Sequence, residues 1–473
     1  MNGRERMDIA MRLGVPDRVP VMCQLALGHY FLNAGLDAID IWHDTDAFVE
    51  ALIRLQQRYG FDGILVNLPG RDPDWRRFVK GIELQRDRRI VRWSNGWYTV
   101  APHDDNPHVF QANGVRYFPT LDEVDPERLF YVEPHDLSSI TYPYSWGFDS
   151  DPAVPGSDFF PPWHYDTIRR VVDRVGADVS VHGEVFSPFS QLMELLDYTN
   201  GLIALLDDPG KVLAILERLA EGTIELACGQ VRAGAHAVLI SSAFAGAGLI
   251  SRDHYSTFVE PFERKVIDGV HAVHDVPVYT HTCGAIGDRL DLLEATHTNG
   301  IDTLDPPPLG AVDLADAKAQ TAGRLFIKGN LDPVNTLLLG TPDDVREAAR
   351  ERLRVAAGGG GYILSSACSV APAAPPRASW RFANPSRRGA STTAETVRRR
   401  ARHHASVLRA SLGKQRLPQL GRRPVQLLPT DAGQMRVARE AEIDSDGREC
   451  RLRPRYARWP LRSRIAVRYS WNV

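Results

Sequence analysis

Hydrophobic residues in the first 376 positions fall into two alternating patterns. Short runs rich in β-branched residues predict strands, and longer stretches with apolar residues three and four apart predict amphipathic helices. Eight strands are predicted, at residues 18–25, 62–68, 179–185, 237–242, 276–283, 301–306, 325–331 and 361–368. Such alternation is typical of a parallel sheet built from βα units. Eight units of this kind predict an α/β fold of the TIM (β/α)8 barrel class.

The spacing between the predicted second and third strands is unusually long. Within it, the stretch IELQRDRRIVRWSNGWYTVAP at 82–102 predicts a β-hairpin that turns at Ser94, Asn95 and Gly96. A loop rich in proline and aromatic residues follows. We interpret the whole segment as an insertion between strands 2 and 3, forming a lid or a wall over one end of the barrel.

Composition narrows the class of protein. The chain has 473 residues, of which 43% are hydrophobic and 24% are charged, as in soluble globular proteins. The opening MNGRERMDIAMRLG reads as a charged amphipathic helix without an apolar signal core, and no run of about 18 apolar residues occurs. We therefore expect a cytoplasmic protein with no membrane partner. Five scattered cysteines are too few for a disulfide framework, which leaves free thiols or metal ligands.

The net charge of −3 gives no indication of a nucleic-acid partner, but the charge is unevenly distributed. Residues 377–473 contain 22 Arg and 1 Lys against 7 acidic residues, which leaves 33 basic and 52 acidic residues for 1–376. We therefore divide the chain into a barrel domain at 1–376 and an irregular Arg-rich tail at 377–473. The tail has three interpretations: a product of a frameshift in a GC-rich gene, a disordered extension, or a basic arm that binds phosphates.

A histidine and a cysteine stand two positions apart at the end of the predicted fifth strand, in VPVYTHTCG. Residues i and i+2 of a strand point to the same face, so His281 and Cys283 can both face the barrel mouth, where TIM barrels carry their chemistry. An isolated pair of this kind is also common among ordinary core residues. Cys368 changes the picture, because it ends the predicted eighth strand and faces the same mouth. One imidazole and two thiolates are a typical zinc ligand set with one position open.

Several segments together resemble the uroporphyrinogen decarboxylase superfamily. They are MNGRERMDIAMRLGVPDRVPV, GEVFSPFSQLMELL, LLDDPGKVLAILERL, THTCG, IKGNLDPVNTLLLGTPDDVREAARE and GGGYILSSACSV. The similarity extends over residues 1–376 and is greatest to the zinc-dependent, corrinoid-linked methyltransferase branch, such as the methylcobalamin:coenzyme M methyltransferases. The resemblance implies a zinc motif of the form H-x-C and a distant C, matched by His281, Cys283 and Cys368. It also implies a corrinoid cofactor on a partner protein.

Two carboxylates are further candidates at the mouth. Asp305, in IDTLDPPP, is next to His281 in barrel order and can supply a displaceable fourth ligand. Glu184, in VHGEVFSPF, is an alternative as ligand or as acid/base group. Either residue is equally compatible with a loop-orienting or helix-capping role. Asp332 is expected to cap a helix that Pro333 opens, and His182, Cys23 and Cys228 are expected in the core.

The sequence also limits the reaction. The stretch DRVPVMCQLALGHYF has no arginine after Arg18, so it lacks the guanidinium groups that would hold a polycarboxylate porphyrinogen. Nucleotide-binding and serine-hydrolase motifs are missing from the sequence. We predict a zinc-dependent methyltransferase that moves a methyl group between a corrinoid protein and a thiol or similar acceptor. The alternatives are a decarboxylase of a smaller carboxylated substrate and an inactive or truncated family member.

Overall fold

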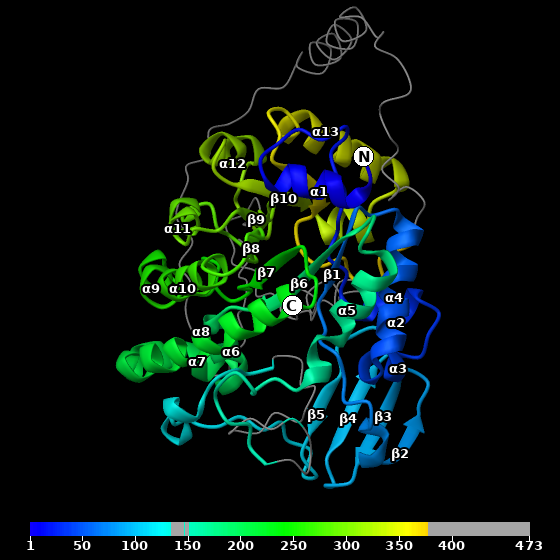
Figure 1. Cartoon of the computed structure of the whole chain (residues 1–473), viewed down its shortest axis with the longest axis vertical. Helices are drawn as coiled ribbons and strands as arrows, with labels where there is room; N and C mark the ends of the chain where they lie inside the picture. The colour runs from blue at the N-terminus through cyan, green and yellow to red at the C-terminus, as the bar shows by residue number, and fades with distance from the viewer. Residues whose placement is uncertain (134–145, 147–150, 377–473) are drawn as a thin grey trace, which may run out of the picture. The chain divides into compact units, whose positions relative to one another are not determined.

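The structure, a computed structural model, describes residues 1–133, 146 and 151–376. Within these residues, seven parallel strands form one curled sheet in the order β1, β6, β7, β8, β9, β10, β11 (Figure 1). Their bounds are β1 (Gly63–Val66), β6 (Ser180–Phe186), β7 (Ala237–Ser241), β8 (Val278–His281), β9 (Gly300–Thr303), β10 (Phe326–Leu331) and β11 (Tyr362–Ser366). Spatial order follows chain order, as expected of successive βα units. Seven of the eight predicted strands are therefore present, whereas the Arg-rich tail from residue 377 lies outside the described residues.

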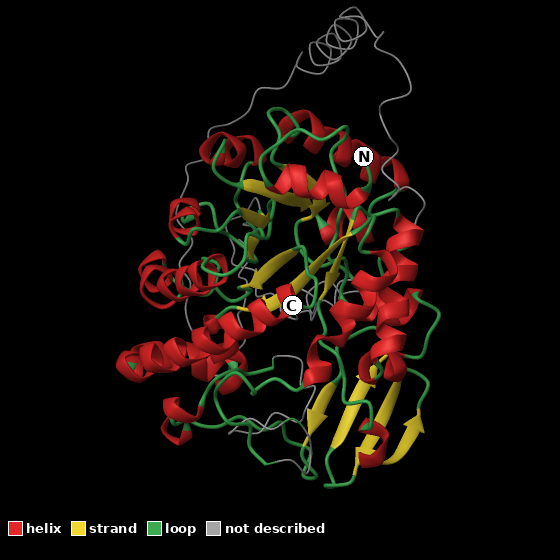
Figure 2. Cartoon of the chain, in the orientation of Figure 1, coloured by secondary structure: helices red, strands yellow, loops and turns green. Residues whose placement is uncertain are grey.

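Four helices precede β1, and the others lie between the later strands; together they surround the sheet (Figure 2). They are α1 (Gly3–Met11), α2 (Leu27–Asn33), α3 (Ala38–His43), α4 (Thr45–Tyr59), α5 (Asp166–Val175), α6 (Pro188–Leu196), α7 (Tyr198–Asp207), α8 (Pro209–Arg232), α9 (Arg252–Phe258), α10 (Glu260–His271), α11 (Leu290–Ala295), α12 (Leu314–Thr321) and α13 (Pro342–Ala356), with a π-helical turn η5 (Pro333–Leu338). Asp332 accepts hydrogen bonds from the backbone of η5, which confirms the cap predicted there. Among the described residues, no helix combines the length and the hydropathy needed to cross a membrane.

The predicted first strand, 18–25, is wrong as a strand. This segment makes only isolated bridges, Val21 to Leu364 and Leu25 to Val370. On its other side, the backbone N–H of Asp62 donates to the carbonyl of Val21, but the N–H of Val21 donates to the Asp62 side chain instead of a strand. The segment thus bonds to both edges of the curled sheet. A regular ladder does not form, because the backbone N–H groups of the segment donate to different partners: Val21 to the Asp62 side chain and Met22 to the carbonyl of Leu364.

The interior of the curled sheet is filled at its amino end and polar at its carboxyl end. Met7, Ala10 and Met11 of α1 form one buried apolar cluster with inward-facing strand residues, among them Tyr279 and Phe326. The helix lies at the start of the strands, since the N–H of Arg4 bonds to Asp178, just before β6. Helix α1 thus closes the amino end of the sheet. Side chains at the carboxyl ends are left to form a site.

A second sheet follows the carboxyl end of β1. It has four antiparallel strands, β2 (Val79–Leu84), β3 (Arg88–Trp93), β4 (Tyr98–Pro102) and β5 (His108–Phe110). Strands β3 and β4 pair across the turn at 94–97, where the hairpin is predicted. The sheet packs through Val91, Trp93 and Ala101 against Ile39 of α3, so it has an apolar core of its own. A position as a lid over the mouth remains a prediction.

Candidate metal centre

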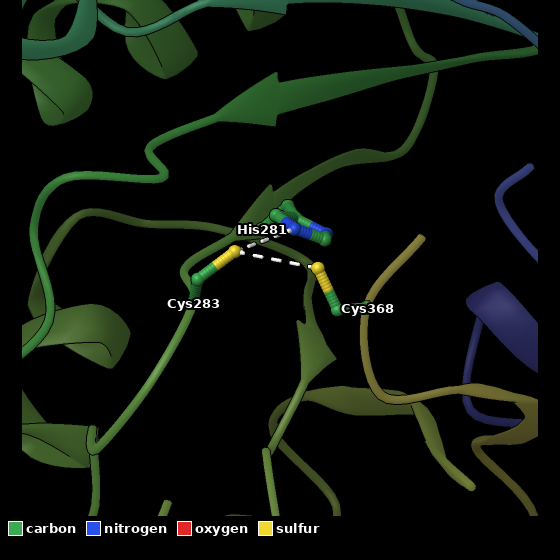
Figure 3. A group of neighbouring side chains, drawn as sticks. All are labelled: His281, Cys283 and Cys368. Carbon is green, nitrogen blue, oxygen red and sulfur yellow. Dashed lines mark hydrogen bonds between the residues drawn. The ribbon is translucent and has the colours of Figure 1, made fainter. Parts of the chain in front are cut away.

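His281, Cys283 and Cys368 come together at the carboxyl end of the curled sheet. His281 is the last residue of β8, Cys283 lies two residues beyond it, and Cys368 lies two residues beyond the end of β11. One ligand atom from each lies within 4.8 Å of the other two. Figure 3 shows the three side chains converging from two separate segments of the chain. The sequence-based placement of the three residues at one mouth agrees with this geometry.

The distances between these atoms are compatible with a zinc ion. His281 Nε2 lies 3.3 Å from Cys283 Sγ, and Cys283 Sγ lies 3.6 Å from Cys368 Sγ. Tetrahedral zinc, with bonds of about 2.3 Å to sulfur and 2.0–2.1 Å to nitrogen, holds its ligand atoms roughly 3.5–3.8 Å apart. His281 is buried, and the two cysteines remain partly exposed. Two thiols and an imidazole in this arrangement fit zinc in ligand type and in spacing.

The three groups strongly shift one another's pKa values. The hydrogen bond between the sulfurs of Cys283 and Cys368 lowers the pKa of Cys368 well below its ordinary value and raises that of Cys283. Burial opposes protonation of His281, but hydrogen bonds to Asp302 and Cys368 outweigh it and raise the pKa of His281 to about 10. Without a metal, these shifts favour an imidazolium beside a thiolate. Because metal ligands must be deprotonated, binding of a metal here displaces protons from His281 and Cys283.

The glycine after Cys283 has a structural reason. Gly284 has a φ of +79°, in the left-handed region that residues with a Cβ avoid. Its N–H donates to Asp305 Oδ2 at 2.7 Å. The turn therefore directs the chain away from the end of β8 immediately after Cys283, and the bond to Asp305 ties it to the loop that follows β9.

Asp305 lies beside the three-residue cluster but does not belong to it. Its carboxylate is occupied in part by Gly284, and its oxygens are outside the set of ligand atoms that lie within 4.8 Å of one another. Burial raises the pKa of Asp305 to about 7, and the nearby Cys368 thiolate adds to this effect. The structure thus shows a loop-orienting contact for Asp305. Its action as a fourth ligand remains a prediction.

Glu184 also faces the interior near the cluster without joining it. It is buried on β6, and burial raises its pKa to about 7, although the charge of His281 partly opposes the shift. A carboxyl group with this pKa exchanges protons near neutral pH. His182, two residues earlier, bonds to Tyr279 and Ser180 on its two ring nitrogens, which confirms its expected role in the core. The buried positions of Cys23 and Cys228 are confirmed as well.

Two residues behind His281 were not predicted from the sequence. Asp302, on β9, accepts from His281 Nδ1 at 3.1 Å, and both of its oxygens lie 2.9 Å from Lys328 Nζ on β10. Both side chains are buried. Burial raises the pKa of Asp302, but the charge of Lys328 and the bond from His281 outweigh it, so the net shift is downward. The signal that the sequence offered was the single charged residue within each of the two strands, β9 and β10.

Comparison with known proteins shows which protein family the residues of this site resemble. The family model described as uroporphyrinogen decarboxylase (URO-D) matches residues 153–387, a stretch that includes all three cluster residues. This stretch of the chain therefore matches the model of the uroporphyrinogen decarboxylase family. The chain is similar both to methyltransferases and to decarboxylases.

Two curated relatives illustrate this division within the family. A methylcobamide:CoM methyltransferase MtbA of Methanosarcina acetivorans is 29% identical over 213 residues, which are 44% of this chain and 58% of that protein. A uroporphyrinogen decarboxylase of Prochlorococcus marinus is 26% identical over 221 residues, 45% of this chain and 60% of that protein. The matches thus span about three fifths of the length of these relatives.

A solved structure shows the same fold. A methyltransferase from Methanosarcina mazei superposes with a TM-score of 0.59 and 18% identity, over 81% of this chain and 97% of that chain. At this identity the likeness establishes the fold and no more. It agrees with a TIM-like arrangement of the uroporphyrinogen decarboxylase family domain.

Proposed function

We propose that the protein is a zinc-dependent methyltransferase that moves a methyl group between a corrinoid protein and a thiol or similar acceptor. The observation that carries the proposal is the convergence of His281, Cys283 and Cys368 within 4.8 Å at the carboxyl end of the sheet. The similarity to a methylcobamide:CoM methyltransferase supports the corrinoid part of the proposal. A cytoplasmic location and the absence of nucleic-acid and membrane partners remain expectations.

In this proposal, His281, Cys283 and Cys368 hold Zn²⁺ and leave one position for the acceptor. Zinc bound there lowers the pKa of a coordinating thiol, which is about 8.5 when free, and so supplies a thiolate at neutral pH. The acceptor's sulfur then attacks the methyl carbon of the corrinoid. The transfer would form a carbon–sulfur bond and break the cobalt–carbon bond, whose electron pair would remain with the corrinoid. The same groups serve the reverse transfer.

The buried carboxyls have separate roles in this scheme. Glu184, with its pKa near 7, is suited to take up or release the acceptor's proton. Asp305 holds the turn at Gly284 and is the candidate for a displaceable fourth ligand. Neither role requires Glu184 or Asp305 to replace His281, Cys283 or Cys368 as a metal ligand.

Methyl transfer is tested by following methylcobalamin spectroscopically with zinc-loaded protein and a panel of small thiols. The proposal predicts thiol-dependent formation of cob(I)alamin, abolished by a strong chelator and restored by added zinc. Loss of the methyl group at the same rate without protein, or with the chelated protein, would contradict it. The second candidate is a decarboxylase of a smaller carboxylated substrate, favoured by the match to uroporphyrinogen decarboxylases. That activity would release CO2 and resist the chelator.

We also propose that residues 1–376 are one domain and that residues 377–473 are a separate tail, whose origin is a frameshift, a disordered extension or a basic arm. Resequencing the gene around the codons for Pro375 to Arg377 tests the first origin. A one-base correction that restores an amphipathic helix after Pro376 would support the frameshift.

A further inference from the structure

The buried pair of Asp302 and Lys328 has no clear benefit to stability by itself. Both side chains lie inside the curled sheet, and their atoms meet at 2.9 Å. Replacing a buried ion pair by apolar residues of similar volume is often neutral or stabilising, because desolvation offsets the attraction between the charges. The presence of a buried ion pair at this position therefore needs a reason other than stability. The contact between Asp302 and His281, a residue of the candidate metal centre, offers one.

The contacts of Asp302 determine which nitrogen of His281 carries a proton. The carboxylate accepts from Lys328 Nζ on both oxygens and from the N–H of Thr303 at 3.1 Å. An ionised carboxylate can only accept, so the contact at 3.1 Å requires a proton on His281 Nδ1. When metal binding removes one proton from the imidazolium, the proton bonded to Asp302 stays on Nδ1, and the lone pair that a metal needs is on Nε2, the nitrogen that faces Cys283.

Lys328 keeps the Asp302 carboxylate in its anionic form, in which it can only accept a hydrogen bond from His281. Lys328 lies opposite Asp302 in the register of β9 and β10, and its side chain is buried together with that of Asp302. Its positive charge keeps an anion next to His281 in a place that water does not reach. Carboxylates that bond to the second nitrogen of a metal-ligating histidine fix its orientation and increase its basicity.

We propose that Asp302 and Lys328 are positioning residues that act through His281: together they hold the imidazole with its Nε2 lone pair directed at the metal. This inference rests on the zinc site of the proposed function, but not on methyl transfer. It concerns metal affinity, which is measured without any turnover.

Asp302→Asn gives a directional test. Lys328 needs an acceptor, so the amide oxygen is expected to face Nζ and the amide N–H2 to face His281 Nδ1. That arrangement favours the wrong tautomer, with the proton on Nε2. The double variant Asp302→Asn/Lys328→Met removes the competitor and lets the amide oxygen turn to His281. Asp302→Leu/Lys328→Met keeps an apolar filling but offers His281 no acceptor.

The experiment measures zinc dissociation constants of the full chain by competition with a chromophoric chelator, together with the visible spectrum of the cobalt-substituted protein. Asp302→Asn is expected to bind zinc about 10–100-fold more weakly than the unaltered protein. The Asn/Met double variant is expected to recover part of that loss, and the Leu/Met double variant is not. Asp62→Asn is the matched control. Asp62 is also a buried carboxylate paired with a cationic side chain, that of Arg18, but it lies at the amino end of the sheet, away from the metal centre.

The outcomes separate the two proposals. Unchanged affinity in Asp302→Asn, or equal affinity in the two double variants, overturns the positioning role while leaving the zinc site intact. An unaltered protein that binds no zinc overturns both. Zinc binding with the expected order of variants but no methyl transfer supports the positioning role and contradicts only the proposed function. If Asp302→Asn fails to fold, the two charge-free double variants still decide the question, since they differ only in the acceptor at position 302.

Discussion

Cys283 and Cys368 are 85 positions apart in the chain, and their sulfur atoms lie 3.6 Å apart. Parallel strands bring this about, because the carboxyl ends of β8 and β11 open at the same end of the curled sheet. Each cysteine lies two residues beyond its strand, so neither is constrained by the ladder. The site is thus made by loops on a rigid scaffold, as is common for catalytic groups.

Glu184→Gln tests the acid/base role proposed for this residue. Glutamine keeps the shape of the side chain but cannot exchange a proton, so methyl transfer to a thiol is expected to slow by roughly 100-fold. Zinc content should not change, because Glu184 is outside the three-residue cluster. Turnover with cobalamin and zinc analysis of the same preparation check both expectations. Normal turnover would rule out proton transfer by Glu184.

Asp62→Asn tests which contacts hold residues 18–25 against the edges of the curled sheet. Asp62 is buried, bonds to Arg18 through both oxygens at 2.7 Å, and accepts from the N–H of Val21. The substitution leaves the arginine charge without its partner, which typically costs about 3–5 kcal/mol when the pair is buried. Because Arg18 is partly exposed, we expect about 2–3 kcal/mol in denaturant unfolding. A loss below about 1 kcal/mol would show that the bridges to β11 hold the segment alone.

Glu263→Gln tests a buried carboxyl on α10, outside the three-residue cluster. Burial raises the pKa of Glu263 from 4.5 to about 7. The folded protein therefore binds more protons than the unfolded chain between these values, so this group lowers the free energy of unfolding as the pH rises from about 4.5 to 7. Glutamine removes that dependence. Relative to the unaltered protein, the variant should gain about 3 kcal/mol between pH 4.5 and 8. A difference in unfolding free energy that stays constant with pH would contradict the assignment.

Much of the fold follows from local patterns in the sequence. Alternating strands and helices predict the parallel sheet, since hydrophobic periodicity is set within each element. The same reasoning places His281 and Cys283 at a strand end. It fails at residues 18–25, where an apolar run with the right composition makes no regular ladder. Pro20 has no N–H to donate, and the N–H of Val21 is taken by a side chain 41 positions away.

The pair behind His281 could not be predicted in the same way. Asp302 and Lys328 are 26 positions apart, and only the register of β9 against β10 brings them opposite each other. Sequence shows one charge in each strand but not that the two charges meet. Similarly, the sequence places Asp305 and Glu184 near the mouth. It does not show that their oxygens lie outside the group of ligand atoms formed by His281, Cys283 and Cys368.

The central claim is that His281, Cys283 and Cys368 hold zinc, and metal analysis tests it most directly. The full chain, loaded with zinc and freed of excess metal, is compared with Cys368→Ser and with Cys228→Ser, a control in which a buried cysteine of α8 is changed instead. The unaltered protein and the control are expected to retain one equivalent of zinc per chain, and Cys368→Ser to lose most of it. Zinc retained undiminished in Cys368→Ser, or no zinc in the unaltered protein, would contradict the account.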